Sequence, residues 1–261
     1  MSIHDDNLLL IYCCTLAALL GAAFGSFLNC AAWRAVHGGS VLRGRSRCPD
    51  CGHVLGAADL VPVLSWLLLR GKCRWCGRPV PARYLLTELG FALVSVLCLL
   101  RFDLTAECLR NWVFLCCLYC LSLADLDGQI VPDGCLVIAA LAWLAALPFL
   151  WSGWADAGLR LLAGAVYGGG LLVLSLAMDR LLGKETLGGG DVKLFAVIGL
   201  YLGLAGGLFA LLLACVLGLI FAFLTHRGPG AKLPFAPCIS LAAAAMLLYG
   251  GPLVGWYLSL F

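Results

Sequence analysis

Four cysteines have the spacing of a metal site. Cys48 and Cys51 form one Cys-x-x-Cys pair, and Cys73 and Cys76 form a second. A glycine directly follows each pair, which suits a tight turn. Two such pairs separated by about twenty residues are typical of a zinc ion held by four thiolates. Because four cysteines leave no open position for water, we expect a structural Zn²⁺ and not a catalytic one.

The simpler interpretation is that these are ordinary cysteines in a cysteine-rich chain. The sequence holds fifteen cysteines, and the remaining eleven lie in or beside apolar segments, where cysteine acts as a small hydrophobic residue. The doubled pair with its repeated glycine is more specific than chance spacing, so the metal interpretation is preferred.

Aspartates form the second group of candidate residues. Asp125, Asp127 and Asp133 lie in LSLADLDGQIVPDG at 121–134, and Asp191 follows three glycines at the start of an apolar run. Two carboxylates brought close together share one proton and can activate water as base and acid, the chemistry of aspartic proteases. A structural role stays open, since aspartate also caps helices and Asp-Gly pairs form turns.

The elements that position these residues are membrane-spanning helices. The 261-residue chain is 63% hydrophobic and only 12% charged, whereas soluble domains are about 25% charged. We predict an all-α polytopic membrane protein of about eight transmembrane helices with a small cytoplasmic zinc-binding insert. The expected spans are 8–30, 84–100, 110–125, 134–151, 159–179, 192–205, 207–225 and 238–260. Only LAGG joins the sixth and seventh spans, so a seven-span chain is the alternative.

Basic residues predict the orientation of these spans. Nine of the seventeen Lys and Arg lie between the first two spans, so this loop is expected to be cytoplasmic and both chain ends outside. The acidic start MSIHDDN is unlike a signal peptide. Alternating spans then place Asp125 and Asp191 at one depth near the cytoplasmic face. In a reducing cytoplasm, disulfides between the four paired cysteines are not expected.

Three regions follow from this organisation. Residues 1–33 form the first transmembrane helix, 34–83 the cysteine-bearing insert, and 84–261 the helix bundle with the two aspartates. The second half of the insert, DLVPVLSWLLLRGKCRW at 59–75, is apolar but too short to span a membrane. We expect it to lie along the membrane surface or to pack on the bundle.

The motifs together resemble the type IV prepilin peptidases, bacterial membrane aspartic proteases with a G-x-G-D motif. The resemblance covers nearly the whole chain. It is carried by the two cysteine pairs and by GSFLN at 25–29, DLVPVLSWLLLRGKCRWCG at 59–77, RYLLTEL at 83–89, DLDGQIVPD at 125–133, GGGDVKLFAVIG at 188–199 and LPFAPCIS at 233–240.

The resemblance implies an activity and assigns its residues. The family aspartates correspond to Asp125, seven residues before Pro132, and to Asp191. The family cleaves the basic leader of type IV prepilins or type II secretion pseudopilins after a glycine, at the cytoplasmic face of the inner membrane. Many members then methylate the new N-terminus with S-adenosylmethionine, and the cysteine-bearing insert goes with those members. Expected partners are therefore prepilin-like proteins and the lipid bilayer, and no nucleic acid.

Some features leave alternatives open. Ala236 stands where the family pattern suggests glycine, and no G-x-G-x-x-G motif marks a methyl-donor site, so its residues are unassigned. A peptidase without methylation is one alternative. A transporter or metal-handling protein is another, although the aspartates are expected at one interface and transporter sites lie near the midplane.

Overall fold

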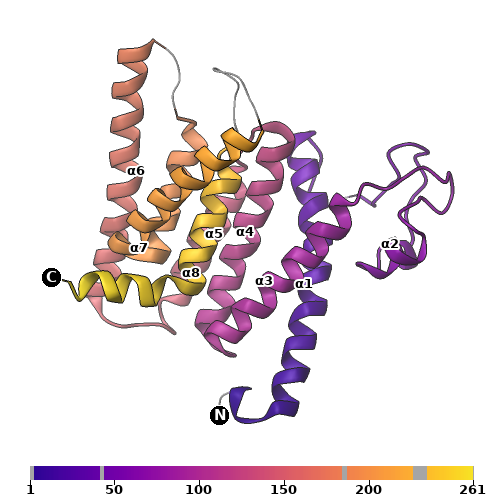
Figure 1. Ribbon diagram of the computed structural model, residues 1–261, viewed down its shortest axis with the longest axis horizontal. Coiled ribbons are helices and arrows are strands. Elements are labelled where there is room, and N and C mark those ends of the chain that lie inside the picture. Colours follow the sequence, from indigo (N-terminus) through magenta and orange to yellow (C-terminus); the bar gives the residue numbers. More distant parts are fainter. Residues whose placement is uncertain (1–2, 42–43, 184–186, 226–233, 261) are drawn as a thin grey trace. The chain divides into compact units, whose positions relative to one another are not determined.

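The computed structural model describes residues 3–41, 44–183, 187–225 and 234–260, which are helical with no β-strand among them beyond two isolated bridges (Figure 1). The chain divides into two compact units, Met1–Cys108 and Leu109–Phe261. Each unit packs around its own helices, and the two candidate sites fall in different units.

The first unit is built on two antiparallel helices, α1 (Asn7–Val36) and α3 (Arg83–Phe102). A short segment, η1 (Ile3–Asp5), precedes α1, and the insert between the helices contains η2 (Ala57–Asp59) and α2 (Leu64–Leu68). Gly25 lets the helices approach, because a Cβ there would lie 3.0 Å from the backbone of Glu88. A buried hydrogen bond of 3.1 Å from Asn29 Nδ2 to Thr87 Oγ1 sets their register.

The second unit contains α4 (Ala106–Gly128), which begins at the end of the first unit, followed by α5 (Asp133–Ala146), α6 (Trp154–Leu182), α7 (Gly189–Leu224) and α8 (Ala236–Leu258). Glycines let α6 and α7 touch through their backbones. A Cβ at Gly199 would lie 2.8 Å from the carbonyl carbon and oxygen of Ala163. Small residues of this kind typically allow close helix packing in membranes.

Helix α7 is not straight, since Gly203 has φ 68° and ψ −170° in its middle. On α6, Gly168 lies against Ala196, while the neighbouring Tyr167 packs its ring on Gly207 and donates its hydroxyl to the carbonyl of Leu204. Ala196 and Gly207 would be about 16 Å apart along a straight helix. Both contact one turn of α6, so the chain bends back at Gly203, as Figure 1 shows.

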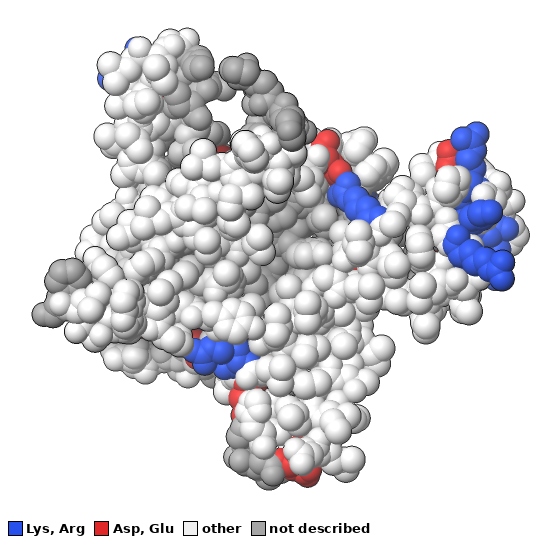
Figure 2. Space-filling model, in the orientation of Figure 1, with Lys and Arg blue, Asp and Glu red and all other residues white. Residues whose placement is uncertain are grey.

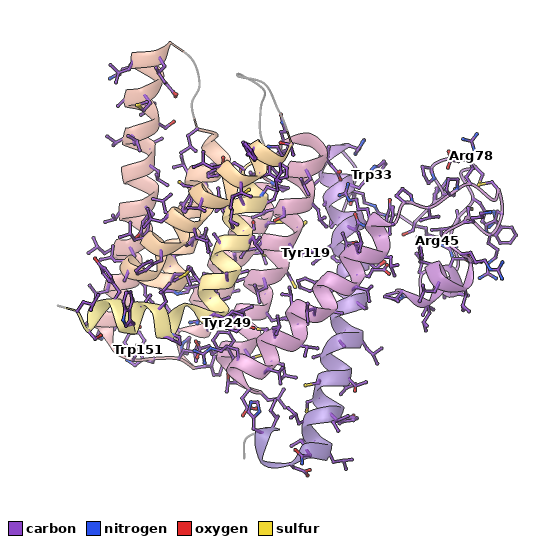
Figure 3. The ribbon with its side chains drawn as sticks, in the orientation of Figure 1. Trp33, Arg45, Arg78, Tyr119, Trp151 and Tyr249 are labelled. Carbon is purple, nitrogen blue, oxygen red and sulfur yellow. The ribbon has the colours of Figure 1, made fainter. Side chains whose placement is uncertain are left out.

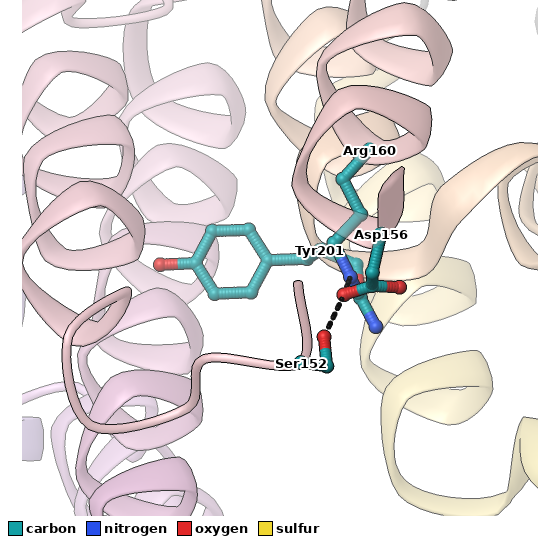
Figure 4. A network of polar contacts seen from close by, with 4 residues as sticks. All are labelled: Ser152, Asp156, Arg160 and Tyr201. Carbon is teal, nitrogen blue, oxygen red and sulfur yellow. Dashed lines mark hydrogen bonds and ion pairs between the residues drawn. The ribbon is translucent and has the colours of Figure 1, made fainter. Parts of the chain in front are cut away.

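A polar network fixes this bend where the first arm of α7, which begins beside Asp191, comes to its end (Figure 4). Asp156 accepts a hydrogen bond of 2.7 Å from Ser152 and forms an ion pair of 3.1 Å with Arg160. Arg160 donates to the carbonyl of Tyr201 at 2.8 Å, and the Tyr201 hydroxyl donates to Ala139 at 2.9 Å. The network ties α5, α6 and α7 together two residues before the bend.

The all-helical membrane class is confirmed, and the chain is a multi-pass membrane protein. Six helices in the described part of the chain are long and apolar enough to cross a bilayer: α1, α3, α4, α6, α7 and α8. The expected span at 134–151 is the shorter α5, whose helix ends at Ala146 after 14 residues. The two expected spans in 192–225 are the arms of the bent α7, which counts as one helix.

Candidate active site and metal site

Asp125 lies in the last turn of α4 and is buried. Its Oδ2 atom accepts a hydrogen bond of 3.0 Å from the backbone N–H of Ala236, the first residue of α8. The N-terminus of a helix carries unpaired N–H groups and a partial positive charge, which favours a carboxylate there. Helix α8 therefore orients one carboxylate oxygen of Asp125 and leaves the other without a hydrogen-bond partner among the described residues.

Asp191 lies in the first turn of α7 and is half-buried. It is not the N-cap, a role taken by Gly188, whose carbonyl accepts a hydrogen bond of 3.0 Å from the Asp191 N–H. The carboxylate of Asp191 interacts electrostatically with that of Asp125, 66 residues earlier in the sequence. Two carboxylates in one partly buried place are the arrangement in which a proton is shared.

Asp127 is oriented differently from Asp125, although only two residues separate them. Two residues correspond to about 200° of rotation around a helix, so the two side chains leave opposite faces of α4. Asp127 is exposed, whereas Asp125 is buried. The Asp-Gly pair at 127–128 is also not a turn, because it forms the last two residues of α4; the next residue, Gln129, leaves the helix with a positive φ of 54°.

The loop between α4 and α5 packs on the start of α7. A Cβ at Gly190 would lie only 2.6 Å from the Cβ of Val131, so glycine is needed for this approach. An exposed ion pair joins Lys193 Nζ to the Asp133 carboxylate oxygens at 2.8 and 3.0 Å. These contacts hold α7 beside the end of α4. Sequence reasoning identified the glycine run but missed its contact, and it missed the N–H of Ala236, although both lie in motifs noted above.

The four predicted metal ligands lie together in the insert. The Sγ atoms of Cys48, Cys51, Cys73 and Cys76 all lie within 4.8 Å of one another, and those of Cys48 and Cys76 are 3.9 Å apart. Four sulfurs at 2.3 Å around a tetrahedral Zn²⁺ would be about 3.8 Å from each other. The described cluster therefore fits a metal ion of this size with little movement.

Each cysteine pair forms the same small turn. Gly52 and Gly77 both have φ of 70°, and the N–H of each donates to the carbonyl of the first cysteine of its pair at 2.9 Å. Within the second turn, hydrogen bonds from the backbone N–H groups of Cys76 and Trp75 lower the pKa of Cys73 to about 7. Cys73 therefore loses its proton to form the metal-binding thiolate more readily than an ordinary cysteine does.

Basic residues neighbour the four cysteines in the sequence. Arg74 forms an ion pair of 2.7 Å with Asp59, and Arg78 lies 3.9 Å from Asp50. Figure 2 shows Lys and Arg gathered on the insert, from which Arg45 and Arg78 project in Figure 3. Positive charge near four thiolates offsets the net negative charge that the cluster keeps after binding a divalent cation.

Comparisons with known proteins place the chain in one family. Residues 19–102 match the bacterial peptidase A24 N-terminal domain, and 112–223 match the type IV leader peptidase family. A prepilin leader peptidase/N-methyltransferase of Myxococcus xanthus (strain DK1622) is 40% identical over 81% of this chain, which spans 64% of that relative's length.

Two further relatives match over nearly their whole length. A type 4 prepilin-like proteins leader peptide-processing enzyme of Escherichia coli O78:H11 is 35% identical over 89% of this chain and 92% of its own length. A prepilin leader peptidase/N-methyltransferase of Bacillus subtilis (strain 168) is 30% identical over 93% and 96%. No solved structure is a significant match. The chain therefore belongs to the type IV leader peptidase family, peptidase A24, whose curated relatives are prepilin leader peptidase/N-methyltransferases.

Proposed function

We propose that Asp125 and Asp191 are the catalytic pair of a prepilin leader peptidase. The observation that carries this proposal is the electrostatic interaction of two carboxylates at the ends of α4 and α7, one of them held by the N–H of Ala236. Together they would hold one proton and one water molecule, as a carboxylate pair in an aspartic protease does.

The chemistry requires the pair to act as base and acid. One carboxylate removes a proton from water as the water oxygen attacks the carbonyl carbon of the scissile bond. The other donates its proton to the leaving nitrogen, the carbon–nitrogen bond breaks, and a new carboxyl group and amine form. The pair ends with one proton, as it began, because one was accepted and one donated.

The substrate class follows from the family and from the predicted orientation. We expect the enzyme to cut the basic leader of type IV prepilins or pseudopilins after a glycine, at the cytoplasmic face of the bacterial inner membrane. This location is supported by the concentration of Lys and Arg in the insert, which predicts that the insert is cytoplasmic. The ends of α4 and α7 that carry the aspartates would then lie on that side.

Asparagine variants test the catalytic pair. Asp125→Asn and Asp191→Asn should each lower the rate of leader cleavage by about 10⁴-fold, as expected for members of a unit that acts together. Asp127→Asn is the matched control, since it makes the same change on an exposed side chain two residues away, and it should keep activity within about threefold of wild type. Cleavage of a prepilin is measured in proteoliposomes, and normal processing by either of the first two variants would exclude this mechanism.

Methyl transfer to the new N-terminus is the second proposed activity, and its support is the names of the curated relatives. S-adenosylmethionine would supply the methyl group, with the amine nitrogen as acceptor. Mass analysis of prepilin processed by the purified enzyme, with and without this donor, reports cleavage position and methylation together. A processed pilin that stays unmethylated in the presence of the donor would show that the protein cleaves the leader but does not methylate the new N-terminus.

We further propose that the four cysteines bind one structural Zn²⁺. The close approach of their four Sγ atoms supports this assignment. Elemental analysis should find one zinc per chain, and less than half of that after Cys51→Ser, with the exposed Cys215→Ser as control.

A further inference from the structure

The insert contains an uncharged segment within an otherwise highly charged region. The ten residues 60–69 carry no charge and are bounded by Asp59 and Arg70. They include α2, on which the exposed Leu64, Leu67 and Leu68 have the spacing of one helix face, and the exposed Leu60 and Val61 lie just before it. The exposed fractions range from 41% to 81% over Leu60, Val61, Leu64, Leu67 and Leu68.

The position of this apolar face is set by a hydrogen bond to a membrane helix. The Glu88 carboxylate, buried against α1, accepts a bond of 2.6 Å from the backbone N–H of Val63. Glu88 is the sixth residue of α3, so it lies about 7.5 Å along the helix from Arg83. Helix α3 has 20 residues and is about 30 Å long, which matches the hydrocarbon thickness of a bilayer. Because Val63 is bonded to Glu88, the start of α2 lies about 7.5 Å in from the end of a helix that is long enough to span the hydrocarbon.

The backbone at Val63 adopts an uncommon conformation to reach this level. Val63 has φ 63° and ψ −53°, and the Leu64 N–H donates to the Pro62 carbonyl at 2.6 Å, which together define a γ-turn of the rare type. A β-branched residue adopts positive φ only when its surroundings hold it there. The bond from Val63 to Glu88 is such a constraint, because it returns the chain toward α3 before α2 begins.

The segment also pairs much of its polar backbone within the chain, which suits a lipid environment. Pro62 has no N–H, and the Trp66 indole N–H donates to the Val80 carbonyl at 3.1 Å. The backbone N–H groups that donate to partners in the described chain include those of Leu60, Val63, Leu64, Ser65, Leu67 and Leu69.

We propose that residues 60–68 form an interfacial anchor whose apolar face is inserted into the lipid bilayer at the level of the first turns of α3. Lipid is the favoured occupant because the anchor is tied to a helix whose own exposed leucines, among them Leu86 and Leu93, face outward at and below this level. Glu88 acts as a positioning residue for the anchor. The anchor would keep the four-cysteine cluster, which begins its second turn at Cys73, close to the membrane surface.

Photo-crosslinking tests this proposal in the intact protein. A benzophenone amino acid is placed singly at Leu64 or Leu68, at Leu93 as the lipid-exposed control, or at Arg78 as an exposed control on the second cysteine turn. After irradiation in phospholipid vesicles, mass spectrometry counts lipid adducts. Leu64 and Leu68 should give yields within about threefold of Leu93, and Arg78 at least tenfold less. Yields as low as at Arg78, or adducts to peptides from 109–261 in place of lipid, would overturn the proposal.

The role of Glu88 is tested with the probe at Leu68. Glu88→Ala removes the acceptor for Val63 and should lower the lipid-adduct yield at least fivefold, whereas Glu88→Gln keeps a carbonyl acceptor and should retain most of it. Adducts at Leu93 and the zinc content should not change in either variant, which separates loss of the anchor from general unfolding. An unchanged yield at Leu68 in Glu88→Ala would refute the positioning role.

Discussion

The close contact between Gly190 and Val131 offers a sharp test of how the two aspartates are held together. In Gly190→Ala, the new Cβ would lie 2.6 Å from the Val131 Cβ and 2.8 Å from one of its methyl groups, whereas ordinary contacts between such atoms are 3.4–4 Å. The loop after α4 and the start of α7 must therefore separate by about 1 Å, a displacement that overpacked sites reach by shifting backbone.

This displacement acts directly on the site, because Asp191 follows Gly190 and Asp125 lies six residues before Val131. A misplacement of about 1 Å in a catalytic constellation can cost about 10²-fold in rate. We therefore expect Gly190→Ala to lower kcat/KM for leader cleavage by about 10²-fold. The free energy of unfolding should fall by only about 1–3 kcal/mol, because the strain is local.

Gly189→Ala is the matched control, since a Cβ there has no neighbour within 4 Å and alanine is also the better helix former. It should keep wild-type cleavage. The double variant Gly190→Ala with Val131→Gly removes the clashing atoms and should recover activity relative to Gly190→Ala alone. Kinetics of prepilin cleavage in proteoliposomes provide the assay. Full activity of Gly190→Ala, or equal losses in both single alanine variants, would refute the reasoning.

Three further predictions concern stability. Gly199→Ala forces a Cβ against the backbone of α6 and should destabilise the second unit by about 1–3 kcal/mol, whereas Gly170→Ala, with open space around it, should be neutral; thermal unfolding in detergent measures both. Removing the metal with a strong chelator should raise hydrogen exchange across 46–80 and leave α6 and α7 protected, because the insert is too small to hold its fold by apolar burial alone. A hydrogen bond from the backbone N–H of Gly56, together with the nearby Arg74, lowers the pKa of Asp59 in the folded protein. The ionised Asp59 carboxylate therefore stabilises the fold above the unfolded pKa of 3.8, and this stabilisation is lost as pH falls through the folded pKa. Asp59→Asn should remove this part of the acid dependence of hydrogen exchange in the insert.

Local features of the sequence were sufficient to predict the elements. The long apolar runs predict the helices because a bilayer imposes a minimum length on them. The two Cys-x-x-Cys-Gly segments predict their own turns, since the ligands and the glycine lie within five residues. Their approach to one another also follows from chemistry, because a metal ion needs four ligands and only these two Cys-x-x-Cys pairs are followed by glycine; the other such pair, Cys117 and Cys120, lies in an apolar run. The expected apolar segments are helical, and the two in 192–225 are the arms of α7 on either side of the kink at Gly203.

The arrangement around the aspartates depends on contacts that are distant in the sequence. Local patterns left Asp191 as a helix cap and Asp127 as a turn residue, because these short-range roles use the same residue types. Only the packing of the helices brings the Asp125 carboxylate within hydrogen-bond distance of the Ala236 N–H, 111 residues later, and Gly190 into contact with Val131.

The sequence by itself therefore determined the membrane class, the cysteine cluster and the motifs that carry the family resemblance, since each is encoded by composition or by spacing within a few residues. The tertiary structure decided which oxygen of Asp125 is held, how Asp191 meets it, and where α7 turns back at Gly203. These features depend on how glycine and alanine surfaces let helices approach, a property of paired faces that no single segment contains.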